Sequence, residues 1–213
     1  MTIYMRPTFE IPKLPTLLLS FIFCLLTRAH ELKAETLDPF DPFDNSSFEI
    51  TTNEEGDKDK SAKQLILEAA VLLDDERLLD ARTKLLRALQ RDPLDYRAHL
   101  MLSGYYLDHV GHFRLSLKYA KRALDLFYKT KGYPPYNETG DRMSHQQLLY
   151  LISQIRLNLD DYNGSLRTLD EFSSYGYTAP WYSGSRAWVL MKLGKIEEAI
   201  KVARQGVEDA SEP

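Results

Sequence analysis

Small residues recur through this chain at an interval of about 35 residues. Ala81 is followed at that interval by Ser116, and Ala69 is followed by Gly104. A period of this length is typical of a repeated pair of helices. Only Ala, Gly or Ser at the points where two helices cross lets the backbones approach closely enough to bury the leucine-rich ridges around them. The recurrence therefore predicts an all-α fold built from stacked helical hairpins.

Four copies of the pattern can be aligned, over residues 62–95, 97–128, 146–179 and 180–213. In the second copy a small residue, a turn glycine, an aromatic residue and further small residues follow one another at Gly104, Gly111, Phe113, Ser116, Ala120 and Ala123. These positions resemble the tetratricopeptide repeat family. The resemblance implies an α-solenoid of about four helix-turn-helix repeats over residues 61–213. Phe172 stands where the family has Ala, and the frame of the third and fourth copies stays open by one residue.

The repeat is interrupted between the second and third copies. Ser116 and Ser165 are 49 residues apart, 14 more than the interval before them. The excess falls in residues 129–145, whose glycines and prolines are expected to stop any helix. The sequence therefore predicts an inserted loop, which is either a binding surface carried by Tyr133 and Tyr136 or a passive connection.

The first 34 residues have the composition of a secretory signal peptide. Basic residues precede an apolar stretch, Leu14–Leu26, that is shorter than the roughly 20 residues a membrane-spanning helix needs. Small residues suited to cleavage stand at Ala29 and Ala34. We therefore expect the signal peptide, within residues 1–34, to be cleaved after Ala29 or after Ala34 and the protein to be exported to a periplasm or to the cell exterior. The alternative is an uncleaved signal that anchors the protein in the membrane.

Residues 35–60 form an acidic segment, with nine acids against two lysines. This composition cannot bury enough apolar surface to order itself, so a disordered linker is expected. The tandem Asp-Pro-Phe sequence over residues 38–43 is either a docking motif or part of a spacer. The whole chain carries a formal charge of −4, which leaves residues 61–213 almost neutral and without an electrostatic footprint for nucleic acid.

Residue types that carry chemistry are sparse. The single cysteine, Cys24, lies within the expected signal peptide, so thiol chemistry is not expected in the mature chain. His109 and His112 are close in sequence, but Gly111 places them in a turn and no further ligands stand nearby. No phosphate-binding loop or nucleophile motif is present in the sequence. The sequence therefore predicts a protein that is not an enzyme and that has no catalytic residue, metal or cofactor.

The resemblance to tetratricopeptide repeats also implies a binding groove, because the first helix of each repeat lines the concave side in that family. The groove positions carry over to Met101, Tyr105, Asp108, Tyr150, Gln154, Trp181 and Trp188. Aromatic and methionine side chains suit the capture of a partner peptide or helix. The alternative is that these residues, the two tryptophans above all, pack inside the solenoid. The Lys and Asn set with which family members clamp a peptide carboxylate is missing.

The last repeat carries apolar residues that the following sequence does not cover. Ile196, Ile200 and Val207 are followed by the short segment Glu208–Pro213. Terminal units of a stacked repeat need a polar outer face, and contiguous exposed apolar area marks an interaction surface. The C-terminal repeat is therefore expected to pair with another chain, by self-association or with a partner protein.

Taken together, these features favour an exported protein–protein interaction module that acts as a scaffold or adaptor. Its partner is expected to bind in the groove of the repeats. The alternative is the helical domain, or a regulator, of an enzyme that processes the cell envelope or a polysaccharide. That alternative requires titratable groups that converge in a pocket.

Overall fold

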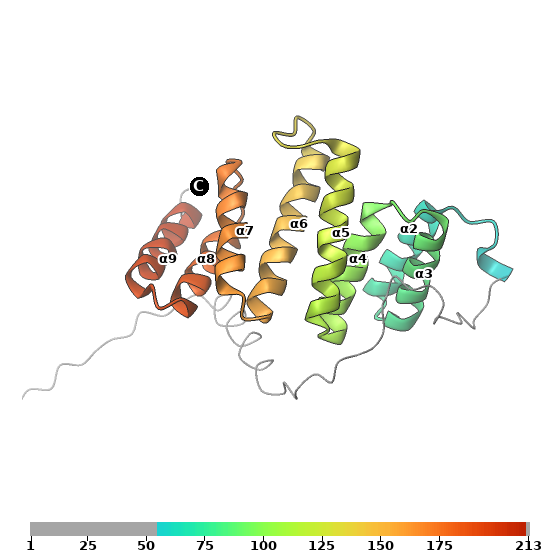
Figure 1. The fold of residues 1–213 in the computed structure, drawn as a ribbon, viewed down its shortest axis with the longest axis horizontal. Helices are drawn as coiled ribbons and strands as arrows, with labels where there is room; N and C mark the ends of the chain where they lie inside the picture. Colours follow the sequence, from blue (N-terminus) through green and yellow to red (C-terminus); the bar gives the residue numbers. More distant parts are fainter. Residues whose placement is uncertain (1–54, 212–213) are drawn as a thin grey trace, which may run out of the picture. The chain divides into compact units, whose positions relative to one another are not determined.

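The computed structural model describes residues 55–211, and the expected signal peptide and most of the acidic linker lie outside them. Within the described residues the fold is all-helical, with eight α-helices and no strand (Figure 1). The all-α prediction is confirmed for this part of the chain. The α-helices are α2 (Ala62–Asp74), α3 (Leu78–Arg91), α4 (Tyr96–Tyr105), α5 (Phe113–Lys131), α6 (Thr139–Asn158), α7 (Tyr162–Ser174), α8 (Tyr182–Lys192) and α9 (Ile196–Ser211). A short 3₁₀ helix, η2 (Glu55–Asp57), precedes them, and a π-helix, η3 (Tyr106–Val110), follows α4.

The helices pack as four consecutive hairpins. The most extensive contacts join α2 with α3, α4 with α5, α6 with α7, and α8 with α9. Neighbouring hairpins contact each other through α3 and α4, α5 and α6, and α7 and α8. Figure 1 shows this succession, with α2 at one end of the helical region and α9 at the other. The hydrophobic core consists of several clusters along the chain, and each cluster joins helices of neighbouring hairpins.

A residue in the left-handed conformation follows the first helix of every hairpin. Glu76, Gly111, Asp160 and Gly194 have φ angles of 58°, 74°, 57° and 75°. They are 35, 49 and 34 residues apart, so the interval seen in the small residues is also present in the backbone. Glycine adopts this conformation freely, whereas Glu76 and Asp160 adopt it at a cost of roughly 1 kcal/mol. Positions in different hairpins can therefore be compared by counting along the chain from these four residues.

Side-chain caps define where several helices begin. Ser61 accepts a hydrogen bond from the backbone N–H of Gln64, and the Gln64 side chain accepts one from the Ser61 N–H in return. Asp95 and Asp161 cap α4 and α7 by accepting a backbone N–H two or three residues further on. Each cap satisfies a donor that the helix leaves unpaired and contributes about 1 kcal/mol.

The crossing point of the second hairpin is formed by two serines. Ser103 Oγ donates to the Ser116 carbonyl oxygen at 2.8 Å, Ser116 Oγ donates to the Ser103 carbonyl oxygen at 2.7 Å, and both residues are fully buried. Gly104, which the sequence pattern places at this crossing, is only half-buried, so that prediction is wrong by one residue. The first-helix interval from Ala69 to Ser103 is 34 residues, one less than the second-helix interval. The π-helix η3 accommodates the additional residue.

The insertion between the second and third hairpins is mostly helical. α5 extends to Lys131 and α6 begins at Thr139, so the connection is residues 132–138 and the predicted loop of 129–145 is too long. Gly140, one of the residues expected to stop a helix, lies in the first turn of α6, where the backbone N–H groups have no partner within the helix in any case. The additional turns bury His145.

The last residues of the expected linker belong to the packed structure. Asp57 is 4% exposed and forms ion pairs with Lys60, Lys84 and Arg87. Two of these partners lie on α3, so the contacts hold residues 57–60 against that helix. The predicted linker, which ends at residue 60, is therefore too long, because residues 57–60 belong to the packed structure.

Replacing Gly206 by Ala is expected to destabilise the fourth hairpin by about 1–2 kcal/mol, although Ala is the better helix former. A Cβ at Gly206 would overlap the Cβ of Ser183 on α8 and would lie 2.9 Å from its Oγ. Because the Ser183 Cβ is attached directly to the backbone, the overlap is relieved only when the two helices move apart. Thermal unfolding followed by circular dichroism measures the change.

Gly104→Ala is the matched control for this prediction, since a Cβ there would meet no heavy atom within 4 Å. It is expected to stabilise the protein by up to about 1 kcal/mol through helix propensity. Equal shifts for the two variants would contradict the close approach of α8 and α9 at Gly206.

Candidate functional site

A shallow hollow of about 500 Å³ lies along the first helix of the third hairpin. Its lining comes from one side of α6 and from the residue that precedes α8, and comprises Gly140, Met143, Ser144, Gln146, Gln147, Tyr150 and Trp181. Met143 is 61% exposed. The lining offers amides, a hydroxyl, a thioether and aromatic rings but no charged side chain, so it suits an uncharged and partly apolar group.

Two aromatic rings form the floor at the α8 end of this hollow. The ring centroid of Trp181 lies 4.4 Å from that of Tyr150 and 4.8 Å from that of Phe172. Phe172 is fully buried, whereas Tyr150 and Trp181 are half-buried. Burial raises the pKa of Tyr150, and the negative charge of Asp108 raises it further. The two rings are therefore held in place by the core and still present a face to solvent.

Further along the same helices, Gln154 and Trp188 continue this surface. Gln154 Nε2 donates to Ser185 Oγ at 3.3 Å, which joins α6 to α8. Trp188 follows Ser185 by three residues and so lies on the same side of α8, with the Lys192 ammonium 5.0 Å from the centre of its ring. Tyr150, Gln154, Trp181 and Trp188 together form the α6–α8 surface.

Three of the predicted groove residues lie elsewhere. Tyr105 is 6% exposed and belongs to the core shared by the first two hairpins, and Met101 packs against the same core. Tyr105 is therefore not a groove residue, because the one-residue change of register in α4 turns it toward the preceding hairpin. Asp108 is exposed on η3, and its charge reaches Tyr150. The structure brings the other four predicted residues together.

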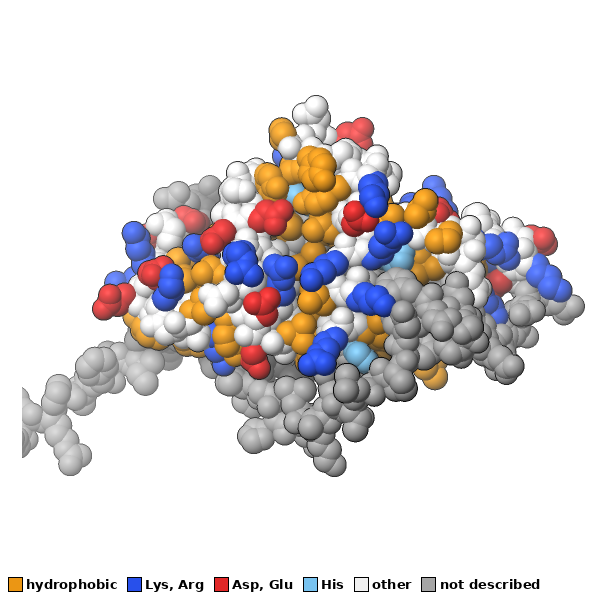
Figure 2. All heavy atoms as spheres, viewed as in Figure 1, with side chains coloured by type: hydrophobic (Ala, Val, Ile, Leu, Met, Phe, Trp, Pro, Cys, Tyr) orange, Lys and Arg blue, Asp and Glu red, His pale blue; other side chains and the backbone are white. Residues whose placement is uncertain are grey.

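The connection between α5 and α6 exposes one of its two predicted contact residues. Tyr133 is 77% exposed, and its ring stacks on that of Tyr128 with centroids 4.7 Å apart. Tyr136 is half-buried, its Oη donates to the Gly132 carbonyl oxygen at 2.8 Å, and burial raises its pKa to about 12. Figure 2 shows hydrophobic side chains gathered over this connection, while charges of both signs are interspersed over the rest of that face.

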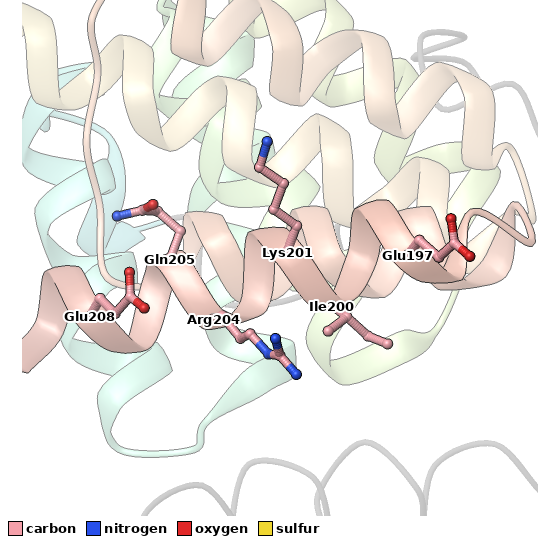
Figure 3. A pocket seen from close by; sticks show the side chains of 6 residues that line it. All are labelled: Glu197, Ile200, Lys201, Arg204, Gln205 and Glu208. Carbon is pink, nitrogen blue, oxygen red and sulfur yellow. The ribbon is translucent and has the colours of Figure 1, made fainter.

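The apolar residues predicted as a surface of the last repeat are exposed. Ile196, Ile200 and Val207 are 49%, 48% and 60% exposed. Ile200 also lines a hollow whose lining side chains all project from α9, namely Glu197, Ile200, Lys201, Arg204, Gln205 and Glu208 (Figure 3). A single helix cannot enclose a ligand, so this hollow is a gap between side chains and not a small-molecule site.

The sequence did not reveal the network of aromatic rings and hydrogen bonds that surrounds His145. His145 is 0% exposed, and its ring stacks on that of Phe127 with centroids 5.9 Å apart. Its Nε2 lies 2.9 Å from Tyr128 Oη, and its Nδ1 lies 3.0 Å from Tyr177 Oη. Burial lowers the pKa of His145 from 6.5 to about 4. The histidine is therefore neutral at neutral pH.

Both ring nitrogens of His145 therefore have a tyrosine hydroxyl as partner, and Tyr128 Oη also lies 3.4 Å from Glu171 Oε1. Because a neutral imidazole has one donor and one acceptor nitrogen, one tyrosine accepts from the ring and the other donates to it. A ring closed off from solvent holds structure together and cannot meet a substrate. The signal that could have revealed the network is the density of aromatic residues at Phe127, Tyr128, Tyr133, Tyr136, Tyr175 and Tyr177.

No three His, Cys, Asp or Glu side chains of residues 55–211 come together so as to hold a metal ion. His112 caps α5, since its Nδ1 accepts from the Leu115 N–H at 3.3 Å. No helix in the same range combines the length and the apolar character needed to cross a membrane.

Comparison of the chain with protein-family models and with curated proteins yields no match.

Proposed function

We propose that this protein is an exported protein–protein interaction module, a tetratricopeptide-like α-solenoid that acts as a scaffold or adaptor. Its partner is a peptide segment or a helix that binds on the α6–α8 surface. The observation that supports this most strongly is the pair of half-exposed rings, Tyr150 and Trp181, held over the buried Phe172 beside an uncharged hollow. Rigid aromatic side chains of this kind contribute most of the binding energy at many protein interfaces.

The lining of the hollow indicates what the partner presents. The amides of Gln146 and Gln147 offer donors and acceptors to the backbone of an extended segment. Met143 and Tyr150 flank a place for one apolar side chain of the partner. Because no charged side chain lines the hollow, the affinity is expected to depend little on salt concentration. Export is proposed from the N-terminal apolar stretch, Leu14–Leu26, which lies outside the described residues.

Simultaneous replacement of Tyr150 and Trp188 by Ala is expected to weaken peptide binding at least roughly tenfold, because the variant loses two aromatic contacts. The probe is a labelled peptide selected from a random library on the immobilised full-length protein. Fluorescence anisotropy gives its dissociation constant, and circular dichroism verifies that helicity is retained. Both tryptophans of the chain belong to the α6–α8 surface, so a shift of their emission on binding reports occupancy of the same place.

Tyr133→Ala is the matched control, since it removes an exposed tyrosine from the connection between α5 and α6. It is expected to bind the peptide as the wild-type protein does. If Tyr133→Ala loses binding while the double variant of Tyr150 and Trp188 binds fully, the site lies at residues 132–138 and not on the α6–α8 surface.

A further inference from the structure

The packing of α5 on α6 shows how one hairpin covers the next. Counted from the left-handed Gly111, the residues two, six and thirteen positions later are Phe113, Leu117 and Leu124. All three pack in one cluster with apolar side chains of α6, which are Leu151, Ile152 and Ile155. The apolar stripe of α5 is thus partly covered by α6, the first helix of the next hairpin.

The last described helix carries the same stripe. Counted from the left-handed Gly194, the residues two, six and thirteen positions later are Ile196, Ile200 and Val207. Each of them is between 48% and 60% exposed. α9 therefore exposes to solvent the apolar positions that in α5 are half-buried against α6.

The first described α-helix carries the complementary stripe. In α6, Leu151 and Ile155 lie nine and five positions before the left-handed residue of their hairpin and are 8% and 0% exposed. In α2, Leu67 and Val71 lie nine and five positions before the corresponding residue and are each 59% exposed. α2 therefore has the side chains with which α6 covers α5, and it exposes them.

We infer that a second copy of this protein docks head to tail, with α9 of one copy packed on α2 of the next in the register that α5 and α6 use within the chain. A second copy is the occupant because the protein itself carries both halves of a contact that it already forms internally. The two faces are different, so the contact is heterologous and leaves a free face at each end of the assembly. The α6–α8 surface takes no part in it, and the inference is independent of the proposed function.

The charges at the helix ends fit this arrangement. The start of α5 packs with the end of α6, so the two helices are antiparallel. If α9 of one copy packs antiparallel to α2 of the next, Lys195 lies near Asp74 and Glu208 lies near Lys63. Glu197 also lies near Asp74 in this arrangement, and the repulsion between the two carboxylates reduces the electrostatic attraction. Exposed ion pairs contribute little in any case, so the apolar stripes supply most of the binding energy.

Sedimentation equilibrium of the full-length protein tests the inference with two variants, Leu67→Glu and Ile200→Glu, each of which removes one face. The average mass of the wild-type protein is expected to rise with concentration beyond that of a dimer, and each variant alone is expected to be a monomer. An equimolar mixture of the two variants is expected to stop at a dimer, because one keeps the α9 face and the other keeps the α2 face. Circular dichroism verifies that both variants are folded.

Leu79→Glu is the matched control, since Leu79 is 74% exposed on α3 and lies on neither face. This variant is expected to associate as the wild-type protein does. A wild-type protein that stays monomeric at tens of micromolar would overturn the inference. A Leu67→Glu variant that still dimerises would overturn it too, because α9 would then pair with α9 of a second copy. A mixture of the two variants that stays monomeric is the third contradicting result.

Discussion

A fall in pH from 7 to about 4 is expected to cost the folded protein about 3 kcal/mol through His145 alone. Burial lowers the pKa of this histidine from 6.5 to about 4. Between these values the unfolded chain binds a proton that the folded protein does not bind. The contribution is therefore complete above pH 6.5 and is lost as the pH falls toward 4. Urea unfolding at a series of pH values, followed by tryptophan fluorescence, measures the dependence.

His145→Gln isolates the contribution of the histidine. The glutamine amide does not titrate, and it can still donate to Tyr128 or accept from Tyr177. This variant is expected to be less stable than the wild-type protein at pH 7 but to lose less stability on acidification. His109→Gln replaces an exposed histidine on η3 and serves as the control. If His145→Gln shows the wild-type pH dependence, the ring is open to solvent and the description of the network is wrong.

Asp57→Asn is expected to destabilise the protein by about 2 kcal/mol at neutral pH. Burial by itself would raise the pKa of Asp57, but hydrogen bonds from Lys84, Arg87 and Lys60 outweigh it and lower the pKa from 3.8 to about 2. Because the folded pKa lies below the unfolded one, the contribution is present above pH 3.8 and is lost as the pH falls toward 2.

The asparagine keeps the shape of the side chain and removes the charge that offsets Lys84 and Arg87. Urea unfolding at pH 7 gives the free-energy change, and hydrogen exchange shows whether residues 57–60 loosen first. Asp59→Asn is the control, because Asp59 is an exposed acid of the same segment, and its effect is expected to stay within about 0.5 kcal/mol. Equal effects of the two substitutions would mean that the ion pairs of Asp57 add nothing to stability.

The hairpin pattern could be predicted because its signals are local. Gly111 and Gly194 provide left-handed turns that glycine alone adopts freely, and a small residue near each crossing keeps the helices close. These signals predicted the all-helical class, which the structure confirms for residues 55–211. The groove positions Tyr150, Gln154, Trp181 and Trp188 came from the resemblance to tetratricopeptide repeats; in the structure Tyr150 and Gln154 lie on α6, Trp188 lies on α8 and Trp181 immediately precedes α8.

The register of α4 could not be predicted in the same way. Ser103 and Gly104 are adjacent, and both are small enough for a crossing point. The choice between them depends on the reciprocal hydrogen bonds of Ser103 with Ser116, which exist only in the packed hairpin. One residue turns a helix by about 100°, which is enough to move Tyr105 from a groove into the core.

The surroundings of His145 also could not be predicted from the local sequence. Gly132, Pro134 and Pro135 are genuine turn signals, and they do lie in the connection of residues 132–138, whereas Gly140 lies in α6. α6 nevertheless begins before His145, because the histidine and its aromatic neighbours become buried only when α5, α6 and α7 lie together. Tyr177, which bonds His145, is 32 residues away in the sequence.

By itself, the sequence determined where helices pair and turn, since small-residue spacing and left-handed turns act within a few residues of the chain. Only the tertiary structure decided which positions are covered. Leu67 and Leu151 are both leucines, and each lies nine residues before the left-handed residue of its hairpin, yet their side chains are 59% and 8% exposed. The difference arises because α6 packs on a preceding hairpin, whereas α2 is the first α-helix of the described residues. The burial of a side chain depends on which helix packs against it, and the local sequence does not specify that helix.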